Sequence, residues 1–205
     1  MAHKLFITLA TFLVILSGMA EIARSEQLSS DPFMAKAGFT TRPIGHHEFC
    51  KRNRSECRVK SRKAPRVHLT NARWAQLINV NETVNRRVTP MTDFEIFGRE
   101  EVWVYPTDIG DCEDFVLLKR RELIKKGWPV GALLITVVRQ TNGEGHAVLS
   151  VLTDRGDLIL DNLDSQVKVW SETEYHYVKR QSEVDSGRWV AVDDARTSSV
   201  GSLSR

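Results

Sequence analysis

The sequence is poor in the features that mark several classes of protein. It has three cysteines in 205 residues, which is too few for a disulfide-dense scaffold. It has no large excess of charge of one sign, because 29 Lys and Arg against 26 Asp and Glu leave a formal net charge of +3. It shows no internal repeat, and a long apolar run occurs only in the first 20 residues. These absences argue against a small disulfide scaffold, a nucleic-acid-binding polycation and a polytopic membrane protein.

The overall composition is that of a globular protein. Hydrophobic residues make up 41% of the chain and charged residues 27%. The length suits one domain with tails, and nothing in the sequence indicates an oligomer. We expect no nucleic acid among the partners, since the mild basic charge alone does not indicate one.

The first 20 residues have the three-part pattern of a secretory signal peptide. Lys4 gives a basic start, residues 5–16 are uncharged and mostly apolar, and small side chains precede a cleavage site after Ala20. The apolar run is shorter than the roughly 20 residues that a spanning helix needs. We therefore expect a periplasmic or secreted protein with no stable membrane insertion after signal removal. Its compartment is oxidising, so disulfides persist there.

Two helices are predicted in the first half of the remaining chain. Residues 21–45 have no apolar period and indicate an extended lead-in before a domain at 46–192. One helix begins at Thr70 or Asn71, both good N-caps, and ends before Thr89-Pro90. The apolar residues expected to face the core are Trp74, Leu77, Ile78, Val84 and Val88. A second helix runs from Asp111 to Lys126 and is stopped by Gly127.

Strand patterns dominate the second half of the chain. They cover residues 132–138, 145–152, 157–163 and 175–181, with a hairpin turn at 153–156. Helices followed by an antiparallel meander predict an α+β fold. The Ser-rich residues 193–205 are expected to be a disordered tail.

The segment from residue 50 to 66 is strongly basic, with eight Lys or Arg against the single acid Glu56. We interpret it as a solvated loop face. A docking surface for an acidic partner is the alternative.

Cys50 and Cys57 lie seven positions apart in FCKRNRSEC. A short loop can bring two Cα atoms to the separation of about 6 Å that a disulfide needs. His46 and His47 are near, but a C-x6-C spacing is not usual for a zinc site. We therefore predict a disulfide between Cys50 and Cys57, which leaves Cys112 unpaired.

Cys112 is the candidate nucleophile. It lies in GDCED, directly before an apolar helical run. A thiol in the first turn of a helix faces free N–H groups and the positive end of the helix dipole, which lower its pKa. The same N–H groups can stabilise the oxyanion on an attacked carbonyl. The three flanking acids oppose thiolate formation, so the site needs a cationic partner. A buried structural thiol is the alternative.

His146 is the predicted base, because it opens a strand that can hold its imidazole within about 3 Å of the thiol. The competing histidines lie in less suitable contexts: His46, His47, His68 and His176. Asp161, at the end of an apolar strand, is the first candidate to orient the imidazole, and Asp164 is the second. A tight turn at residues 154–155 places His146 opposite a residue beyond Asp161, so their contact requires a bulge or a lopsided turn.

Four motifs in this order resemble the bacterial transglutaminase-like cysteine proteinases. They are PIGH with EFC between residues 43 and 50, GDCED at 110–114, GHAVL at 145–149 and LDN at 160–162. The resemblance covers about residues 40–192, and related members include periplasmic proteases that clip large surface adhesins. It implies a papain/transglutaminase-like core, with Cys112 as nucleophile, His146 as base and Asp161 rather than Asp164 as the orienting residue.

The resemblance also implies additional site residues. The adhesin-cleaving relatives bind calcium through acids that flank the nucleophile, and Asp111 and Glu113 match those positions. Carboxylate oxygens suit calcium, although two acids are few for an ion that takes six to eight oxygens. Trp103 and Tyr105 precede the nucleophile and are candidates for lining the cleft or the oxyanion hole. Two core aromatics are the alternative.

The expected function is that of a cysteine endopeptidase acting on an envelope or surface protein, with no cofactor required for the chemistry. The same thioester intermediate can pass to an amine, which would give transglutaminase or amide-transfer activity. A non-catalytic binding module on this fold is the third hypothesis. Bulk water favours hydrolysis unless the cleft excludes it.

Overall fold

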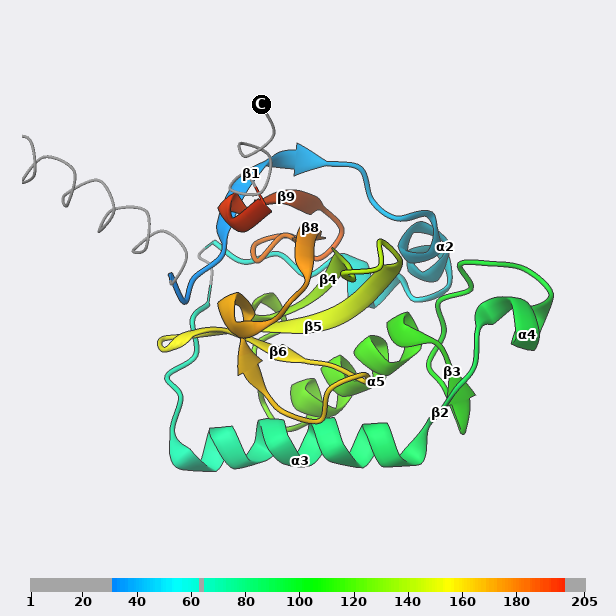
Figure 1. The fold of residues 1–205 in the computed structure, drawn as a ribbon, viewed down its shortest axis with the longest axis horizontal. Helices are drawn as coiled ribbons and strands as arrows, with labels where there is room; N and C mark the ends of the chain where they lie inside the picture. Colours follow the sequence, from blue (N-terminus) through cyan, green and yellow to red (C-terminus); the bar gives the residue numbers. More distant parts are fainter. Residues whose placement is uncertain (1–30, 63–64, 198–205) are drawn as a thin grey trace, which may run out of the picture. The chain divides into compact units, whose positions relative to one another are not determined.

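The computed structural model describes residues 31–62 and 65–197 (Figure 1). The predicted signal peptide and residues 198–205 of the predicted tail lie outside these residues. Pro32–Asp194 form one compact unit, and Ala195–Thr197 belong to another. Among the described residues, no helix combines the length and the apolar character needed to cross a membrane.

A seven-stranded antiparallel sheet is the centre of the compact unit (Figure 1). Its order is β1-β9-β8-β4-β5-β6-β7. The strands are β1 (Ala35–Thr40), β4 (Leu133–Arg139), β5 (Gly145–Thr153), β6 (Gly156–Leu160), β7 (Lys168–Val169), β8 (His176–Gln181) and β9 (Trp189–Asp193). A separate parallel pair joins β2 (Thr89–Pro90) to β3 (Ile109–Gly110).

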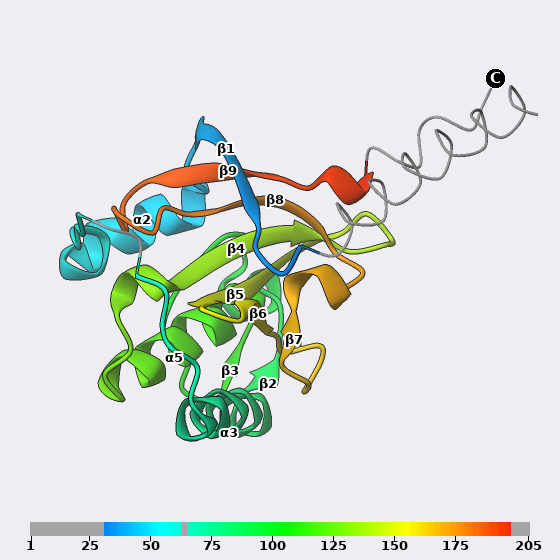
Figure 2. The same ribbon diagram turned by 90° about the vertical axis from the view of Figure 1, so that its left-hand side faces the viewer.

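The helix α5 (Cys112–Lys125) packs on one face of this sheet. The other helices of the compact unit are α2 (Ile44–Arg52), α3 (Asn71–Arg87) and α4 (Asp93–Phe97), with 3-10 turns η1 (Arg54–Cys57), η2 (Val130–Ala132) and η3 (Trp170–Glu172). A further 3-10 turn, η4 (Ala195–Thr197), lies outside this unit. Figure 2 shows α5 between the sheet and α3. Leu77 of α3, Phe115 of α5 and Leu149 of β5 are almost fully buried in the shared core. The α5 helix is therefore held on two sides, which fixes the position of its first residue, Cys112.

The two predicted long helices and the hairpin are confirmed. The Thr70 hydroxyl accepts from Arg73 N at the start of α3, and the Asp111 carboxylate caps α5. The pairing of β5 with β6 is unbroken from Leu149 to Thr153, with a two-residue turn. The third strand is shorter than predicted and ends at Leu160 instead of residue 163.

The extended lead-in is wrong in part. Residues 35–40 form β1, which pairs with β9, and α2 already begins at Ile44. The β1 side chains are nearly all exposed, so no apolar alternation marks this strand, which pairs through its backbone. The beginning of the predicted tail is also structured, because Asp193 ends β9 and the buried Asp194 accepts from Tyr177 N.

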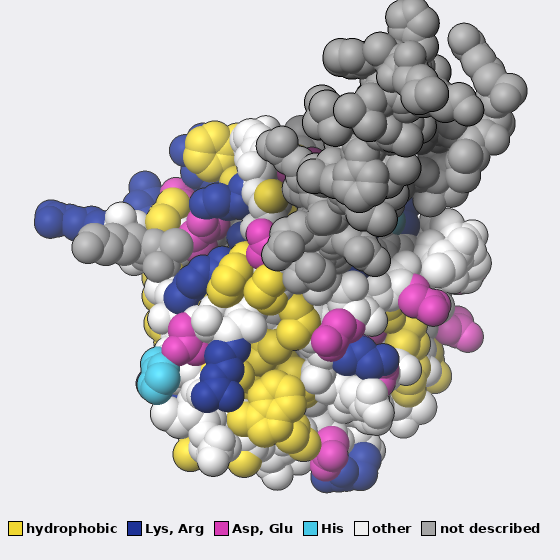
Figure 3. All heavy atoms as spheres, turned by 60° about the vertical axis from the view of Figure 1, so that its left-hand side comes forward, with side chains coloured by type: hydrophobic (Ala, Val, Ile, Leu, Met, Phe, Trp, Pro, Cys, Tyr) yellow, Lys and Arg dark blue, Asp and Glu magenta, His cyan; other side chains and the backbone are white. Residues whose placement is uncertain are grey.

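Trp74 does not face the core as predicted, because 36% of it is exposed. It lines a hollow of about 330 Å³ with Leu69 and Leu158. Figure 3 shows the side of the molecule where α3 begins, and apolar side chains there lie between acidic and basic ones. The helical period therefore identified the buried face of α3 correctly. It did not predict that the first turn of the helix lies at the surface.

Candidate active site

The candidate nucleophile, Cys112, is the first residue of α5 and lies partly buried. Its sulfur hydrogen-bonds to Glu113 Oε2 at 2.9 Å, and the backbone N–H of Ala147 also donates to it. Burial raises the pKa of the thiol well above its ordinary value, and the charge of Glu113 adds to this. The expected lowering of this pKa by the helix terminus is therefore outweighed in this arrangement, because the adjacent carboxylates oppose a negative sulfur.

His146 lies one residue before Ala147 on β5, and its Nε2 is 2.8 Å from Asp161 Oδ1. Both side chains are 3% exposed. The expected bulge is absent from this contact, so that prediction is wrong. Leu149 pairs with Leu160, and the same register places Val148 opposite Asp161. His146 lies two residues before Val148, so its side chain is on the same face of the sheet as that of Asp161. Diagonal neighbours of this kind are within reach of long side chains, so no irregularity is needed.

Asp161 is held by further hydrogen bonds. Leu163 N donates to Oδ1 at 3.0 Å, and the Tyr175 hydroxyl donates to Oδ2 at 2.5 Å. Burial opposes ionisation, but the hydrogen bonds from His146 and Tyr175 outweigh it, so the pKa of Asp161 is lowered. Nothing in the sequence indicates that Tyr175 contacts Asp161, because it is only the first residue of a predicted strand. The second candidate, Asp164, instead binds Lys168 Nζ at 2.6 Å.

Cys112 and His146 line one cavity of about 500 Å³. Trp103 forms part of its wall, and its indole N–H donates to Glu101 Oε2 at 3.2 Å. Gly45 makes this approach feasible, because a Cβ there would lie 2.3 Å from the indole. Tyr105 is placed elsewhere, packed on Phe49 and under the Arg121 guanidinium. The structure thus brings Trp103, but not Tyr105, to the cavity.

Three acids meet beside the nucleophile: Asp93, Asp111 and Asp114 have carboxylate oxygens within 4.8 Å of one another. Burial, followed by repulsion from Glu113, raises the pKa of Asp111 to about 9. Burial also raises the pKa of Asp114 to about 7. Asp93 Oδ1 and Asp114 Oδ2 are buried without a hydrogen-bond partner among the described residues. A hard cation such as calcium fits this set, because it satisfies such oxygens and offsets their repulsion.

The predicted metal ligands are only partly those of this cluster. Asp111 belongs to it, whereas Glu113 places one oxygen against the Cys112 sulfur. Asp93 and Asp114, the other two acids of the cluster, were not among the predicted ligands. Asp114 stands in the GDCED motif and was available as a candidate, but nothing near Asp93 in the sequence indicates its proximity.

The family of this chain follows from a comparison with protein families. The family described as bacterial transglutaminase-like cysteine proteinase BTLCP matches residues 36–197. The chain belongs to this family. The predicted α+β fold with a papain/transglutaminase-like core is thereby confirmed.

Solved structures of Legionella pneumophila LapG are similar to this proteinase. The calcium-bound form is 32% identical over 52% of this chain and 64% of that chain, with a TM-score of 0.46. A second LapG structure is 27% identical over 78% and 85% of the two chains, and the EGTA-treated form is 26% identical over 77% and 86%, both with a TM-score of 0.49. The match therefore spans less than two thirds of the calcium-bound chain. A comparison with curated proteins finds no match.

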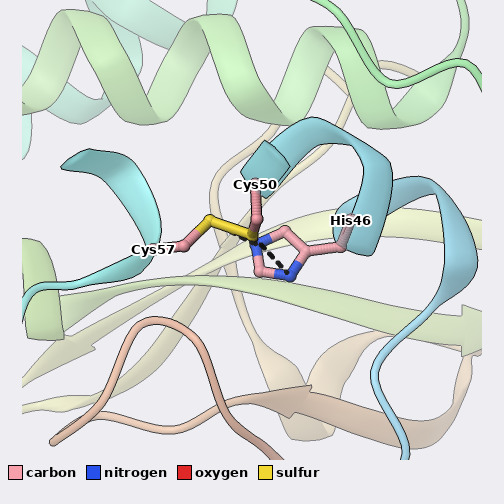
Figure 4. Close-up of side chains that lie close together, drawn as sticks. All are labelled: His46, Cys50 and Cys57. Carbon is pink, nitrogen blue, oxygen red and sulfur yellow. Dashed lines mark hydrogen bonds between the residues drawn. A yellow bond between two sulfur atoms is a disulfide. The ribbon is translucent and has the colours of Figure 1, made fainter. Parts of the chain in front are cut away.

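The predicted disulfide of the proteinase is confirmed: Cys50 in α2 is bonded to Cys57 in η1 (Figure 4). His46 lies against it, and the Trp189 and Gln181 side chains approach its two ring nitrogens at 3.1 Å. Burial, with the charge of Arg42, lowers the pKa of His46 to about 3. His46 is therefore a neutral core histidine and no rival to His146.

Removing the disulfide is expected to lower stability without abolishing the fold. Closing so short a loop contributes about 2 kcal/mol by chain entropy, which corresponds to a fall in Tm of roughly 4–8 °C in the double variant Cys50→Ala/Cys57→Ala. Thermal unfolding of both proteins, with and without a reductant, measures the effect. The variant should not respond to the reductant. An equal Tm for the oxidised wild type and the variant would contradict a stabilising role.

Proposed function

We propose that the chain is an exported cysteine endopeptidase that hydrolyses peptide bonds of an envelope or surface protein. The observation that carries this proposal is the pairing of His146 with Asp161, because His146 lines the same cavity as Cys112. A nucleophile, a base and a group that orients the base are the three parts that acyl transfer requires. Membership of a cysteine proteinase family supports the same reaction.

The geometry assigns the two nitrogens of His146 different roles. Nε2 is engaged by Asp161, so Nδ1 is the nitrogen that takes the proton from the Cys112 thiol. The sulfur then attacks the peptide carbonyl carbon and forms a C–S bond. The backbone N–H of Cys112, at the start of α5, donates to the developing oxyanion. The C–N bond breaks as His146 returns the proton to the leaving amine.

Hydrolysis of the thioester completes the cycle. His146 Nδ1 removes a proton from water, the hydroxide attacks the thioester carbonyl, and the thiol regains its proton as the acid product leaves. Tyr175 and Leu163 keep Asp161 in place throughout. The Cys112 thiol donates a hydrogen bond to Glu113, and this bond must break before the thiol proton passes to His146 Nδ1.

Calcium is the cation that we propose for the acidic cluster. Asp93, Asp111 and Asp114 would hold it, and its charge would offset the carboxylates that oppose a thiolate. LapG of L. pneumophila has been described in calcium-bound and EGTA-treated forms. The chemistry itself needs no cofactor, because the three catalytic groups belong to the chain.

We also propose that the protein acts in the periplasm or outside the cell. Residues 1–20 have the pattern of a secretory signal. The Cys50–Cys57 disulfide agrees with an oxidising compartment. The expected partner is a protein substrate.

Alkylation of the mature protein by iodoacetamide tests the catalytic pair. The rate at Cys112 is followed by peptide mass spectrometry from about pH 4 to 9 in the presence of calcium, for wild type and His146→Ala. We expect rapid labelling well below the ordinary thiol pKa of about 8.5, and loss of this rapid labelling in the variant. Labelling of the wild type as an ordinary thiol would sink the catalytic assignment and favour a binding role.

A further inference from the structure

A buried lysine on the nucleophile helix has no role in the mechanism described above. Lys119 lies in α5 and is 0% exposed. Its Nζ is buried and has no hydrogen-bond partner among the described residues. Lysine is almost never fully buried unless it is paired, and burying an unpaired ammonium is costly. A side chain of this kind needs an explanation other than stability.

The position of Lys119 relates it to the nucleophile. It follows Cys112 by seven residues, which brings it back to nearly the same face of the helix after two turns. Long side chains on a helix lean toward its N-terminus, where Cys112 lies. Lys119 Nζ accordingly lies 5.8 Å from the ring centroid of Phe115, which stands between the two residues on α5.

Asp161 is the charged group that acts on this amine. Burial lowers the pKa of Lys119 from 10.5 to about 7, while the negative charge of Asp161 opposes the lowering. The facing helix α3 contributes Asn85, whose Nδ2 donates to the Asp161 carbonyl at 2.8 Å, and Asn81, which donates to Ser165. Both are neutral. The surroundings therefore present one carboxylate to the lysine, and it is the carboxylate that binds His146.

We propose that Lys119 is a positioning residue of the active site, which acts on His146 and Cys112 from the buried side through the charge of the Asp161 carboxylate. This inference rests on the proposed function. The charged amine favours the ionised form of the Asp161 carboxylate, and in apolar surroundings this effect is weakly screened. An ionised Asp161 stabilises the imidazolium of His146, and this imidazolium supplies the positive charge that the acid-flanked Cys112 requires.

Burial of the lysine should cost stability, and this separates a functional from a structural role. Lys119→Met keeps the length of the side chain and removes the amine. We expect the variant to have a higher Tm than the wild type, because an unpaired buried amine is replaced by an apolar group. The gain should be larger at pH 6 than at pH 9.5, since a lysine whose pKa is lowered on folding destabilises the protein fully below that pKa and progressively less above it.

The catalytic readout is the rate of Cys112 alkylation in excess calcium as a function of pH. Below pH 7, where Lys119 is charged, we expect Lys119→Met to react about tenfold more slowly than the wild type, with the acid limb moved to higher pH. Above about pH 8 the two profiles should converge, because the lysine is neutral there. Leu118→Met, at an equally buried neighbouring position, is the control and should follow the wild-type profile.

Three results would overturn the proposal, each in a different way. An activated wild-type thiol whose profile is unchanged in Lys119→Met contradicts the role of the lysine but not the proposed function. A loss of rate that is equal at all pH values and accompanied by a lower Tm shows a structural role only. An ordinary wild-type thiol contradicts the proposed function and, with it, the role of Lys119.

Discussion

Replacement of Cys112 by Ala is expected to reduce peptide-bond hydrolysis by roughly 10⁴-fold or more, because the variant has no nucleophile with which to form the thioester. New N-termini in an envelope-protein fraction, labelled at their amines and counted by mass spectrometry, measure the activity. The double variant Cys112→Ala/His146→Ala should be no worse than the single one, since the two residues act as a unit. Circular dichroism checks that both variants fold.

The neighbouring acids Asp161 and Asp164 provide a matched control for this experiment. Asp161→Asn removes the charge that faces His146 and should lower kcat by at least about 100-fold. Asp164→Asn removes a charge of the same loop that binds Lys168 at the surface, so the rate should change by less than about twofold. Equal losses in the two variants would show that the loop, and not the Asp161 contact, matters. Persistent hydrolysis in Cys112→Ala would contradict the nucleophile itself.

The positions of Cys112 and His146 in the fold were predictable for a local reason. Cys112 follows a capping Asp and precedes an apolar helical run, and His146 opens an apolar strand. Each residue therefore stands at a boundary that the sequence marks clearly. The pairing of His146 with Asp161 follows from a regular hairpin whose turn was also predictable, once diagonal neighbours are counted.

The residues that were missed depend on contacts between distant parts of the chain. Asp93 and Tyr175 reach the site because α4 and the segment just before β8 fold back onto it. Lys119 begins a run of charged residues, which is typical of an exposed helix face. Its burial depends on the position of α5 between α3 and the sheet. The edge strand β1 pairs through its backbone, which leaves no pattern in its side chains.

Calcium is expected to stabilise the protein, and to do so more strongly as the pH rises. The pKa values of Asp114 and Asp111 are raised to about 7 and about 9 by burial and repulsion. An acid whose pKa is raised on folding costs no stability below its unfolded pKa of 3.8, and costs progressively more as the pH rises toward the folded value. Calcium relieves this cost because it holds the ionised carboxylates together. At about 100 times its Kd it should add about 2.7 kcal/mol, or roughly 5–10 °C in Tm.

The measurement is the Tm in excess calcium and in EGTA, at about pH 5 and about pH 8. Asp93→Asn should remove most of the difference at pH 8, since the amide keeps an oxygen for Val102 N but loses the charge that binds the cation. Glu100→Gln, which lines the same cavity outside the cluster, should keep it. Cys112 alkylation should also be faster in excess calcium than in EGTA, because the carboxylates of the cluster oppose the thiolate. A calcium effect that is the same in Asp93→Asn, or that weakens as the pH rises, would show that the cation binds elsewhere.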